Sequence, residues 1–141
     1  MFEYTRDVFY YETDKMGVVH HSNYIRWLEE ARTKYFAQMG LPYEKTEEMG
    51  VLSPVIGLNV QFLHFARFGD TYTVRLRLIK YTGVRFTVKF TIVNQADVPL
   101  FEGESYHGFI GMDYRPLSLR RVMPQAHEKL QACVEPEVTE A

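Results

Sequence analysis

The hydrophobic positions of the chain follow two periods, and the first of these is the period of a helix. Between Asn23 and Gly40 the apolar side chains step by three or four residues and form one stripe, made of Tyr24, Leu28, Ala31, Tyr35 and Met39. This spacing predicts a helix that buries a broad face. The side chain of Ser22 or Asn23 is expected to cap its start, and Gly40 followed by Pro42 predicts its end.

Alternation of apolar and polar residues, typical of strands, dominates the middle of the chain. Thr71 to Lys80 alternates cleanly, and Val84 to Val93 repeats the pattern. The positions expected to face the core are Tyr72, Val74, Leu76 and Leu78 in the first segment, and Val84, Phe86, Val88, Phe90 and Ile92 in the second. Residues 81–83 and 94–97 contain Gly, Asn or Asp and predict hairpin turns.

Less regular patterns predict the remaining elements. Three further strands are expected, at Glu3 to Glu12, Val55 to Ala66 and Leu100 to Met112. The alternation of the second slips around Leu63 and His64, where a bulge would fit. Residues 44–49 and 125–133 are expected to form short helices, and a frayed end rich in Glu, Val and Pro is expected to follow.

This order of elements predicts an α+β fold in a single domain that covers residues 1–141. The strands from Val55 onward are joined too tightly for helical crossovers, so they are expected to be antiparallel. One face of their sheet needs cover, and the long helix is the only large apolar partner that the sequence offers. We therefore expect a curved antiparallel sheet wrapped around one long central helix.

Composition narrows the possible functions without choosing one. The chain is 46% hydrophobic, and its formal net charge of -2 argues against a general binder of nucleic acids or anionic membranes. Its single cysteine, Cys133, cannot form an internal disulfide. Because no apolar run approaches the length of a membrane span or of a signal-peptide core, we expect a cytoplasmic protein without membrane insertion.

The candidate chemistry lies where the first strand gives way to the helix, in the stretch YYETDKMGVVHHSNYIRW from Tyr10 to Trp27. Taken singly, each polar residue here has an ordinary structural explanation as a turn former, a cap or a core side chain. Together they put a carboxylate, Asp14, shortly before a helix N-terminus with its unpaired N–H groups and positive dipole end. Such a pair can polarise a carbonyl from one side while the carboxylate attacks it, or activates a water, from the other.

Other familiar kinds of site fit the sequence less well. Cys133 lies far along the chain from any suitable histidine, so a hydrolytic triad is not expected. His20 and His21 are adjacent and should diverge, and neither HExxH nor CxxC occurs, so no metal site is expected. Gly17 stands alone and belongs to neither of the glycine-rich phosphate-binding patterns.

The junction residues resemble the signature of a known family. The matching positions are Tyr10, Asp14, Gly17, Val18, Val19, His21, Asn23 and Tyr24. They resemble the hotdog-fold acyl-CoA thioesterases, in particular the YbgC / 4-hydroxybenzoyl-CoA thioesterase family. The similarity continues at Glu30-Ala31-Arg32 and from Phe65 to Asp70. It implies the hotdog fold, in which a sheet wraps a central helix, and hydrolysis of acyl-CoA to a free acid and CoA.

The resemblance also implies roles for single residues. Asp14 matches the catalytic acid, acting as nucleophile or general base, and His21 and Tyr10 match supporting catalytic positions. The residues expected to bind substrate are Gly17, Val18, Val19, Asn23, Tyr24 and Arg67. The substrate implied is an acyl-CoA or an acyl-carrier-protein thioester, and no cofactor is needed because coenzyme A is part of the substrate. Active sites are expected between the subunits of a homodimer or homotetramer.

Basic residues that could meet the phosphates of coenzyme A are scattered along the chain. Arg67, Arg85, Lys89 and Arg115 are candidates, although exposed strand faces commonly carry such residues. A phosphate contact would make binding sensitive to salt.

Two alternatives stay open at this point. A hotdog hydratase or dehydratase would pair a histidine with a carboxylate to move a proton beside the thioester carbonyl. A non-catalytic hotdog module would bind acyl-CoA without reaction. The acid that precedes the glycine favours the thioesterase over both.

Overall fold

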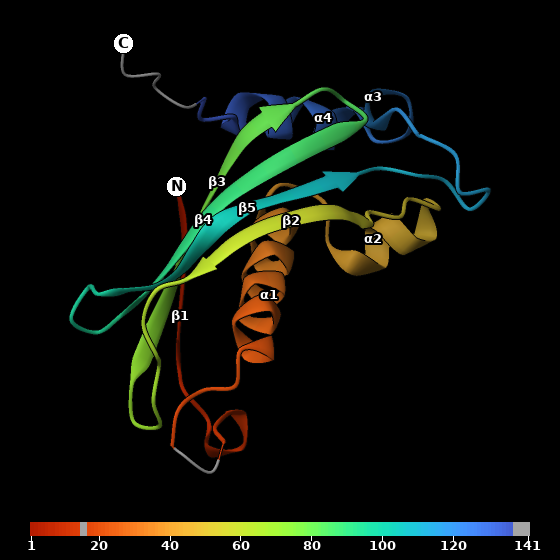
Figure 1. Cartoon of the computed structure of the whole chain (residues 1–141). Helices are drawn as coiled ribbons and strands as arrows, with labels where there is room; N and C mark the ends of the chain where they lie inside the picture. The colour runs from red at the N-terminus through yellow and green to blue at the C-terminus, as the bar shows by residue number, and fades with distance from the viewer. Residues whose placement is uncertain (15–16, 137–141) are drawn as a thin grey trace.

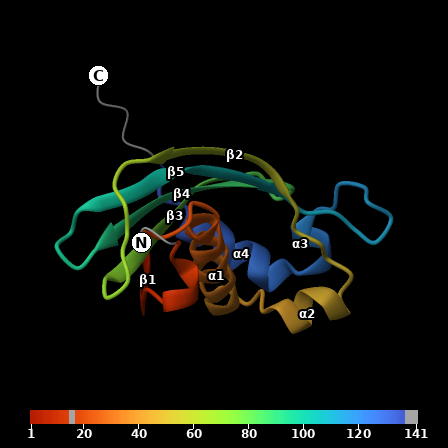
Figure 2. The same cartoon turned by 60° about the horizontal axis from the view of Figure 1, so that its bottom comes forward.

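The chain folds as a curved antiparallel sheet that arches over a long helix (Figures 1 and 2). The computed structural model describes residues 1–14 and 17–136. The strands are β1 (Phe2–Asp7), β2 (Val55–Phe62), β3 (Thr71–Tyr81), β4 (Arg85–Asn94) and β5 (Pro99–Gly108). Their order is β1-β3-β4-β5-β2, so β1 and β2 form the two edges. Every neighbouring pair is antiparallel, which confirms the α+β expectation.

The central helix α1 (Ser22–Gln38) lies beneath the concave face of the sheet (Figure 2). All five residues of the predicted apolar stripe are buried, and Trp27 and Phe36 beside the stripe are buried as well. The helix also ends as predicted. Gly40 adopts φ = +83°, a left-handed conformation that costs glycine little and lets the chain turn away from the helix axis.

The alternation in β3 and β4 predicted the inner face of the sheet correctly. The core-facing residues are almost inaccessible to water: Tyr72, Val74, Leu76 and Leu78 in β3, and Phe86, Val88, Phe90 and Ile92 in β4. Val84, the remaining predicted position, precedes β4 and is half-buried. The expected turn after β4 is closed by the Asn94 side chain, which accepts hydrogen bonds from the backbone N–H groups of Ala96 and Val98.

The first predicted strand was too long. β1 ends at Asp7, and Tyr10–Glu12 forms a turn of 3-10 helix, η1, instead of continuing the strand. The physical reason is the buried carboxylate of Glu12, which accepts a hydrogen bond from the Phe9 N–H at 2.8 Å and closes the turn. A side-chain bond to nearby backbone competes in this way with strand pairing.

The second predicted strand was also too long, because β2 ends at Phe62 rather than at Ala66. The N–H groups of Leu63 and His64 both donate to the carbonyl of Leu100, at 2.8 and 3.3 Å. Two residues facing one is the pattern of a bulge, so the slip in alternation marks the end of the pairing.

Short helices complete the layer beneath the sheet. The predicted helices at 44–49 and 125–133 correspond to α2 (Tyr43–Glu48) and α4 (Pro124–Cys133), and α3 (Leu119–Val122) was not predicted. β5 ends at Gly108, before the expected Met112. Residues 137–141, part of the expected frayed end, lie outside the described residues. No helix of the described chain is long and apolar enough to span a membrane.

Glycine is required where β2 and β5 approach each other most closely. Gly103 in β5 pairs with Val60 in β2, and a Cβ atom added to Gly103 would stand 2.0 Å from the carbonyl oxygen of Asn59. No side chain fits between these two backbones. The absence of a side chain at Gly103 therefore sets the position of β2, which ends two residues beyond Val60 at Phe62.

Candidate active site

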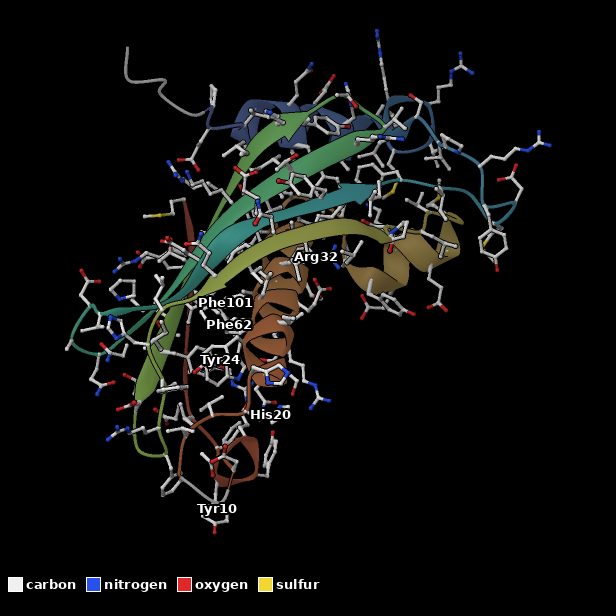
Figure 3. The ribbon with its side chains drawn as sticks, viewed as in Figure 1. Tyr10, His20, Tyr24, Arg32, Phe62 and Phe101 are labelled. Carbon is white, nitrogen blue, oxygen red and sulfur yellow. The ribbon has the colours of Figure 1, made fainter. Side chains whose placement is uncertain are left out.

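A cleft of about 350 Å³ opens at the N-terminal end of α1. The junction before the helix and the segment at the end of β2 both contribute to it. Its lining consists of Asp14, Val18, Val19, His20, His21, Tyr24, Phe62, Leu63, His64 and Phe65. In Figure 3, His20 lies at the start of α1, Tyr24 lies further along the helix, and Phe62 at the end of β2 lies close to Tyr24. Asp14 and His21, predicted to carry the chemistry, therefore face one cavity.

The loop that carries Asp14 is a tight turn closed by its own backbone. The Asp14 N–H donates to the Val18 carbonyl at 2.9 Å, and the Gly17 N–H donates to the Asp14 carbonyl at 3.0 Å. Gly17 adopts φ = +78°, which a side chain would disfavour, so glycine at this position shapes the turn. Lys15 and Met16 lie outside the described residues.

The two valines after the turn attach this loop to the segment that follows β2. The Val19 N–H donates to the Ala66 carbonyl at 2.8 Å, and Val18 forms an isolated bridge with Arg67. The Val19 side chain belongs to the core, whereas Val18 is half-buried. Both border the cleft, so they hold its wall by packing and by backbone pairing.

The start of α1 is organised by His20 and not by the caps expected at Ser22 or Asn23. His20 Nδ1 lies 2.8 Å from Ser22 Oγ and accepts the Ser22 N–H at 3.3 Å, and the His20 carbonyl accepts the Asn23 N–H at 3.0 Å. The predicted caps fail because both side chains already have other partners. Among the described residues, the backbone N–H of His21 has no hydrogen-bond partner. This N–H is therefore available to a ligand at the positive end of the helix.

The imidazole of His21 is exposed and lies against two other rings of the cleft. Its centroid is 4.2 Å from that of His20 and 6.2 Å from that of Phe62, which it meets edge-on. His64 is a third histidine in the same lining. Sequence reasoning missed Phe62 to Phe65 as site residues, although the slip in alternation at Leu63 and His64 pointed to a special position in the strand.

Asn23 and Tyr24 both make structural hydrogen bonds in the interior. Asn23 is 6% exposed, and its Nδ2 donates to the Glu12 carbonyl at 2.9 Å. The buried Tyr24 hydroxyl accepts the Ala66 N–H at 2.9 Å, and desolvation raises the pKa of this phenol. Tyr24 lines the cleft and Asn23 does not. A direct contact of either residue with substrate stays a prediction.

Tyr10 and Arg67 lie outside the lining of the cleft. Tyr10 is 76% exposed, meets Phe68 edge-on at 5.7 Å, and lies far from Tyr24 in Figure 3. The Arg67 side chain is exposed, while its backbone N–H donates to the Asp70 carboxylate at 2.9 Å. Their predicted roles stay predictions, since neither borders the cavity of this single chain.

Glu12 is a buried acid at the junction that sequence reasoning did not identify. It is 6% exposed; its Oε1 accepts the Phe9 N–H at 2.8 Å and its Oε2 accepts Trp27 Nε1–H at 2.5 Å. Its carbonyl accepts the His20 N–H at 3.0 Å in addition to the Asn23 side chain. The one hint in the sequence was an acid in a run of aromatic residues assigned to a strand.

A second hollow of the described surface lacks this combination of groups. A space of about 250 Å³ between α2 and α4 holds Lys45 and Lys129 among largely apolar neighbours, without an acid or a histidine. Within residues 1–14 and 17–136, no three His, Cys, Asp or Glu side chains are grouped so that they could hold a metal ion.

A carboxylate and a helix N-terminus on one cleft can act on a carbonyl compound. The helix end stabilises the carbonyl oxygen as it gains negative charge. The carboxylate can attack the carbonyl carbon or remove a proton from a water. The rings of Tyr24, Phe62 and Phe65 offer an apolar wall to the group attached to that carbonyl.

Comparison with known sequences places this geometry in a family. The family model described as the thioesterase-like superfamily matches residues 8–139. A protein of Bacillus subtilis (strain 168) named "Putative acyl-CoA thioesterase YneP" is 32% identical over 122 residues, which cover 86% of this chain and 88% of that protein.

Solved structures agree with the sequence comparison. The DHNA-CoA thioesterase from Staphylococcus aureus gives a TM-score of 0.84 at 33% identity, with 92% of this chain and 90% of that chain covered. The protein TT1821 from Thermus thermophilus also gives 0.84, at 32% identity, with 94% and 99% covered. The expected hotdog fold is confirmed by these likenesses. The chain, with its acid and helix end on one cleft, belongs to the thioesterase-like superfamily.

Proposed function

We propose that this protein hydrolyses acyl-CoA thioesters to a carboxylic acid and free coenzyme A. The observation that carries the proposal is the cleft that Asp14 shares with the start of α1, in a chain of the thioesterase-like superfamily. Two relatives, YneP and the DHNA-CoA thioesterase, are named for reactions of this kind and support the substrate class.

In the proposed reaction one water is consumed and the carbon–sulfur bond breaks. Asp14 either attacks the thioester carbonyl carbon directly or removes a proton from the attacking water. The His21 N–H and the positive end of α1 stabilise the carbonyl oxygen as it becomes negative. The sulfur leaves as coenzyme A and takes up a proton. After direct attack, the water then hydrolyses the mixed anhydride between Asp14 and the acyl group, which releases the acid and restores the Asp14 carboxylate; in the other route the water adds its oxygen directly to the acid. The His21 ring orients the water or the acyl group.

A second copy of the chain is expected to complete the site. β2 is an edge strand, and its large apolar residues Val55, Ile56, Leu58 and Phe62 are exposed. An edge strand with exposed apolar side chains is suited to pairing with another strand. Pairing along β2 would extend the sheet and bring a partner against the cleft wall at Phe62. Sedimentation of the purified protein tests this, and a stable monomer at micromolar concentration would contradict it.

Arg67 is the basic residue proposed to meet the phosphates of coenzyme A. Its bridge with Val18 holds its backbone against the cleft wall, and its side chain is exposed. Arg85 serves as the comparison because it lies at the other end of the sheet. It is next to Phe86, which pairs with Tyr81 at the end of β3, whereas Arg67 shortly precedes Thr71 at the start of β3. Arg67→Ala should therefore raise KM for acyl-CoA and weaken its salt dependence, whereas Arg85→Ala should do neither.

The decisive test is thiol release by an Asp14→Asn variant over short, long, branched and aromatic acyl-CoAs. We expect turnover to fall by about a thousandfold or more, because the nucleophile or base is lost. Glu44→Gln, the same exchange of carboxylate for amide on the exposed side of α2, is the matched control and should retain full activity. Wild-type turnover in Asp14→Asn would refute the proposal.

The same assays separate the alternatives. Interconversion of enoyl-CoA and hydroxyacyl-CoA without thiol release would indicate a hydratase or dehydratase. Tight binding of acyl-CoA without thiol release across the whole panel would indicate a binding module. Parallel assays with acyl-carrier-protein thioesters compare the two carriers of the acyl group.

A further inference from the structure

The buried carboxylate of Glu12 takes no part in the proposed chemistry, yet it lies two residues before Asp14. Acidic side chains are rarely buried unless they are paired, and removing a charge from water is costly. Well-packed apolar residues often match or exceed the stability that buried charged groups provide. The presence of a carboxylate at this point of the core therefore needs a reason beyond packing.

We propose that Glu12 is a positioning residue for the thioesterase reaction. It fastens the turn that carries Asp14 onto the first turns of α1, and so sets the separation between the Asp14 carboxylate and the helix start. This inference rests on the proposed function, because it assigns Glu12 a role in placing the reacting groups of that same site.

The side chain of Glu12 provides the first attachment. Its carboxylate accepts two hydrogen bonds, from the Phe9 N–H at 2.8 Å and from the indole N–H of Trp27 at 2.5 Å. Trp27 lies in the second turn of α1, is fully buried, and stacks on Tyr72 of β3 with ring centroids 3.8 Å apart. The carboxylate is thus held by a side chain that can hardly move, because the helix and the sheet both fix it.

The main chain of Glu12 provides the second attachment. Its carbonyl accepts the Asn23 side-chain amide at 2.9 Å and the His20 N–H at 3.0 Å. His20 in turn holds the first turn of α1 through Ser22. Glu12 is therefore tied to the helix at two successive turns, through Asn23 and through Trp27, and to the residue that organises the helix start.

The attachments reach Asp14 through a short, paired segment. Only Thr13 separates the two acids, and it is held on both sides, since its hydroxyl donates to the Tyr10 carbonyl at 2.6 Å and it bridges to Val19. A shift of Glu12 would therefore move Asp14 relative to the His21 N–H. A misplacement of about 1 Å between reacting groups can lower a rate by roughly a hundredfold.

The test exchanges the carboxylate for an amide of the same shape. In Glu12→Gln, one of the two facing donors meets an NH2 group instead of an oxygen, so one attachment is lost without a change in volume. Trp27→Phe removes the indole donor. In the double variant Glu12→Gln/Trp27→Phe the indole N–H is absent, so the NH2 group of the glutamine no longer faces another donor. All are compared in thiol-release kinetics and thermal unfolding on the full-length protein, at a temperature where each is folded.

We expect kcat of Glu12→Gln to fall by at least about tenfold while KM stays within about twofold, because the acid moves but the binding surface does not. The double variant should recover part of this loss, at least about threefold in kcat, since its amide no longer faces the indole. Leu130→Ala is the matched control for lost stability: Leu130 is a fully buried residue of α4, at the other end of the molecule from η1 (Figure 1). It should lower Tm and leave kcat unchanged.

A purely structural role gives a different result. If Glu12→Gln lowers Tm but keeps kcat within about twofold of wild type, the inference is wrong. If Glu12→Gln does not fold, Trp27→Phe decides. A fall in kcat of about threefold or more at unchanged KM supports the inference, and wild-type kcat overturns it.

Asp14→Asn, measured alongside, distinguishes this inference from the proposed function. Wild-type turnover in Asp14→Asn removes the proposed function and the inference with it. Loss of turnover in Asp14→Asn together with wild-type kcat in Glu12→Gln overturns the inference alone.

Discussion

Two buried polar clusters lie in the core of this fold, and they are built in different ways. The junction cluster consists of Glu12, Asn23 and Trp27 and adjoins the cleft. The strand pair consists of Ser105 and His107, both on β5. All four polar side chains are almost inaccessible to water, with Glu12 and Asn23 6% exposed and Ser105 and His107 1% exposed.

What the hydrogen bonds connect differs between the clusters. The junction bonds join residues that are 11 and 15 positions apart and tie a loop to a helix. The bond between Ser105 Oγ and His107 Nε2, 2.7 Å long, joins two residues of one strand. His107 Nδ1 is buried without a partner among the described residues. Burial, with a smaller contribution from the charge of Arg32, lowers the pKa of His107 to about 3.

Burial of a polar group therefore has two distinct consequences in this molecule. Groups bonded across distant segments fix a geometry, because each bond can form in only one arrangement of those segments. A group bonded only to its own strand fixes little and carries the cost of its unsatisfied atom. Changes in the junction cluster should alter activity as well as stability, and changes in the strand pair should alter stability and its pH dependence only.

The largest effect is expected from Trp27→Ala. Loss of a buried aromatic ring costs about 4 kcal/mol of unfolding free energy, and the Glu12 carboxylate loses a donor as well. Phe86→Ala, which removes the ring stacked on His107, is the matched control. Urea unfolding should show that Trp27→Ala is the more destabilising, and only Trp27→Ala should lower kcat of the folded protein. Equal kcat values would remove the functional difference between the clusters.

The next effect concerns pH and the strand pair. The folded-state pKa of His107, about 3, lies below the ordinary value of 6.5, so as pH falls the unfolded chain binds a proton that the folded chain excludes. The resulting stability is complete above about pH 6.5 and is lost progressively toward pH 3. At pH 5 the loss is about 2 kcal/mol. In His107→Gln, the difference in unfolding free energy between pH 7 and pH 5 should shrink by that amount, and an unchanged difference would contradict the prediction.

A smaller effect is expected at Tyr24, which lines the cleft. Tyr24→Phe leaves the buried N–H of Ala66 without its acceptor and should cost about 1.5 kcal/mol in urea unfolding. Tyr72→Phe is the matched control, because the Tyr72 hydroxyl is buried with no hydrogen-bond partner in the described part of the chain. Its removal should be neutral or stabilising. A similar loss in both variants would mean that the hydroxyl of Tyr24 contributes only by filling space.

The smallest effect is expected from Ser105→Ala. Loss of one local hydrogen bond to His107 should lower the unfolding free energy by about 1 kcal/mol. Thiol-release kinetics should give an unchanged kcat. A tenfold fall in kcat would show that the strand pair also controls the site.

Periodic patterns sufficed to predict the core, and local competition explains most of the errors. The stripe from Tyr24 to Met39 and the alternation in β3 and β4 were predicted correctly. In a helix or a strand, the position of a residue in the repeat determines whether its side chain faces the core. The ends of β1 and β2 were missed because single hydrogen bonds, from Phe9 to Glu12 and from His64 to Leu100, decided them. Such bonds depend on groups that meet only after folding.

Part of the candidate cleft was predictable. The sequence predicted that Asp14 and His21 lie together because they flank one short junction, so their nearness did not depend on the rest of the fold. Both line the cleft, and their roles in the reaction stay predictions. His64 and Phe65 reach the same cleft from a segment some forty residues away, and no pattern in a single sequence predicts that these two segments come together. Glu12 was missed because its partners are an indole N–H, a side-chain amide and main-chain N–H groups, which leave no pattern of spacing.

Gly103 lies outside the lining of the cleft, but its tight contact with β2 affects the position of Phe62, which lines it. Any side chain there would push the neighbouring edge strand outward, and Phe62 at its end would move with it. The mouth of the cavity would widen although every group facing the bound molecule stayed the same. A substitution at Gly103, which is not part of the cavity lining, would therefore change the size of the molecules that fit the cavity.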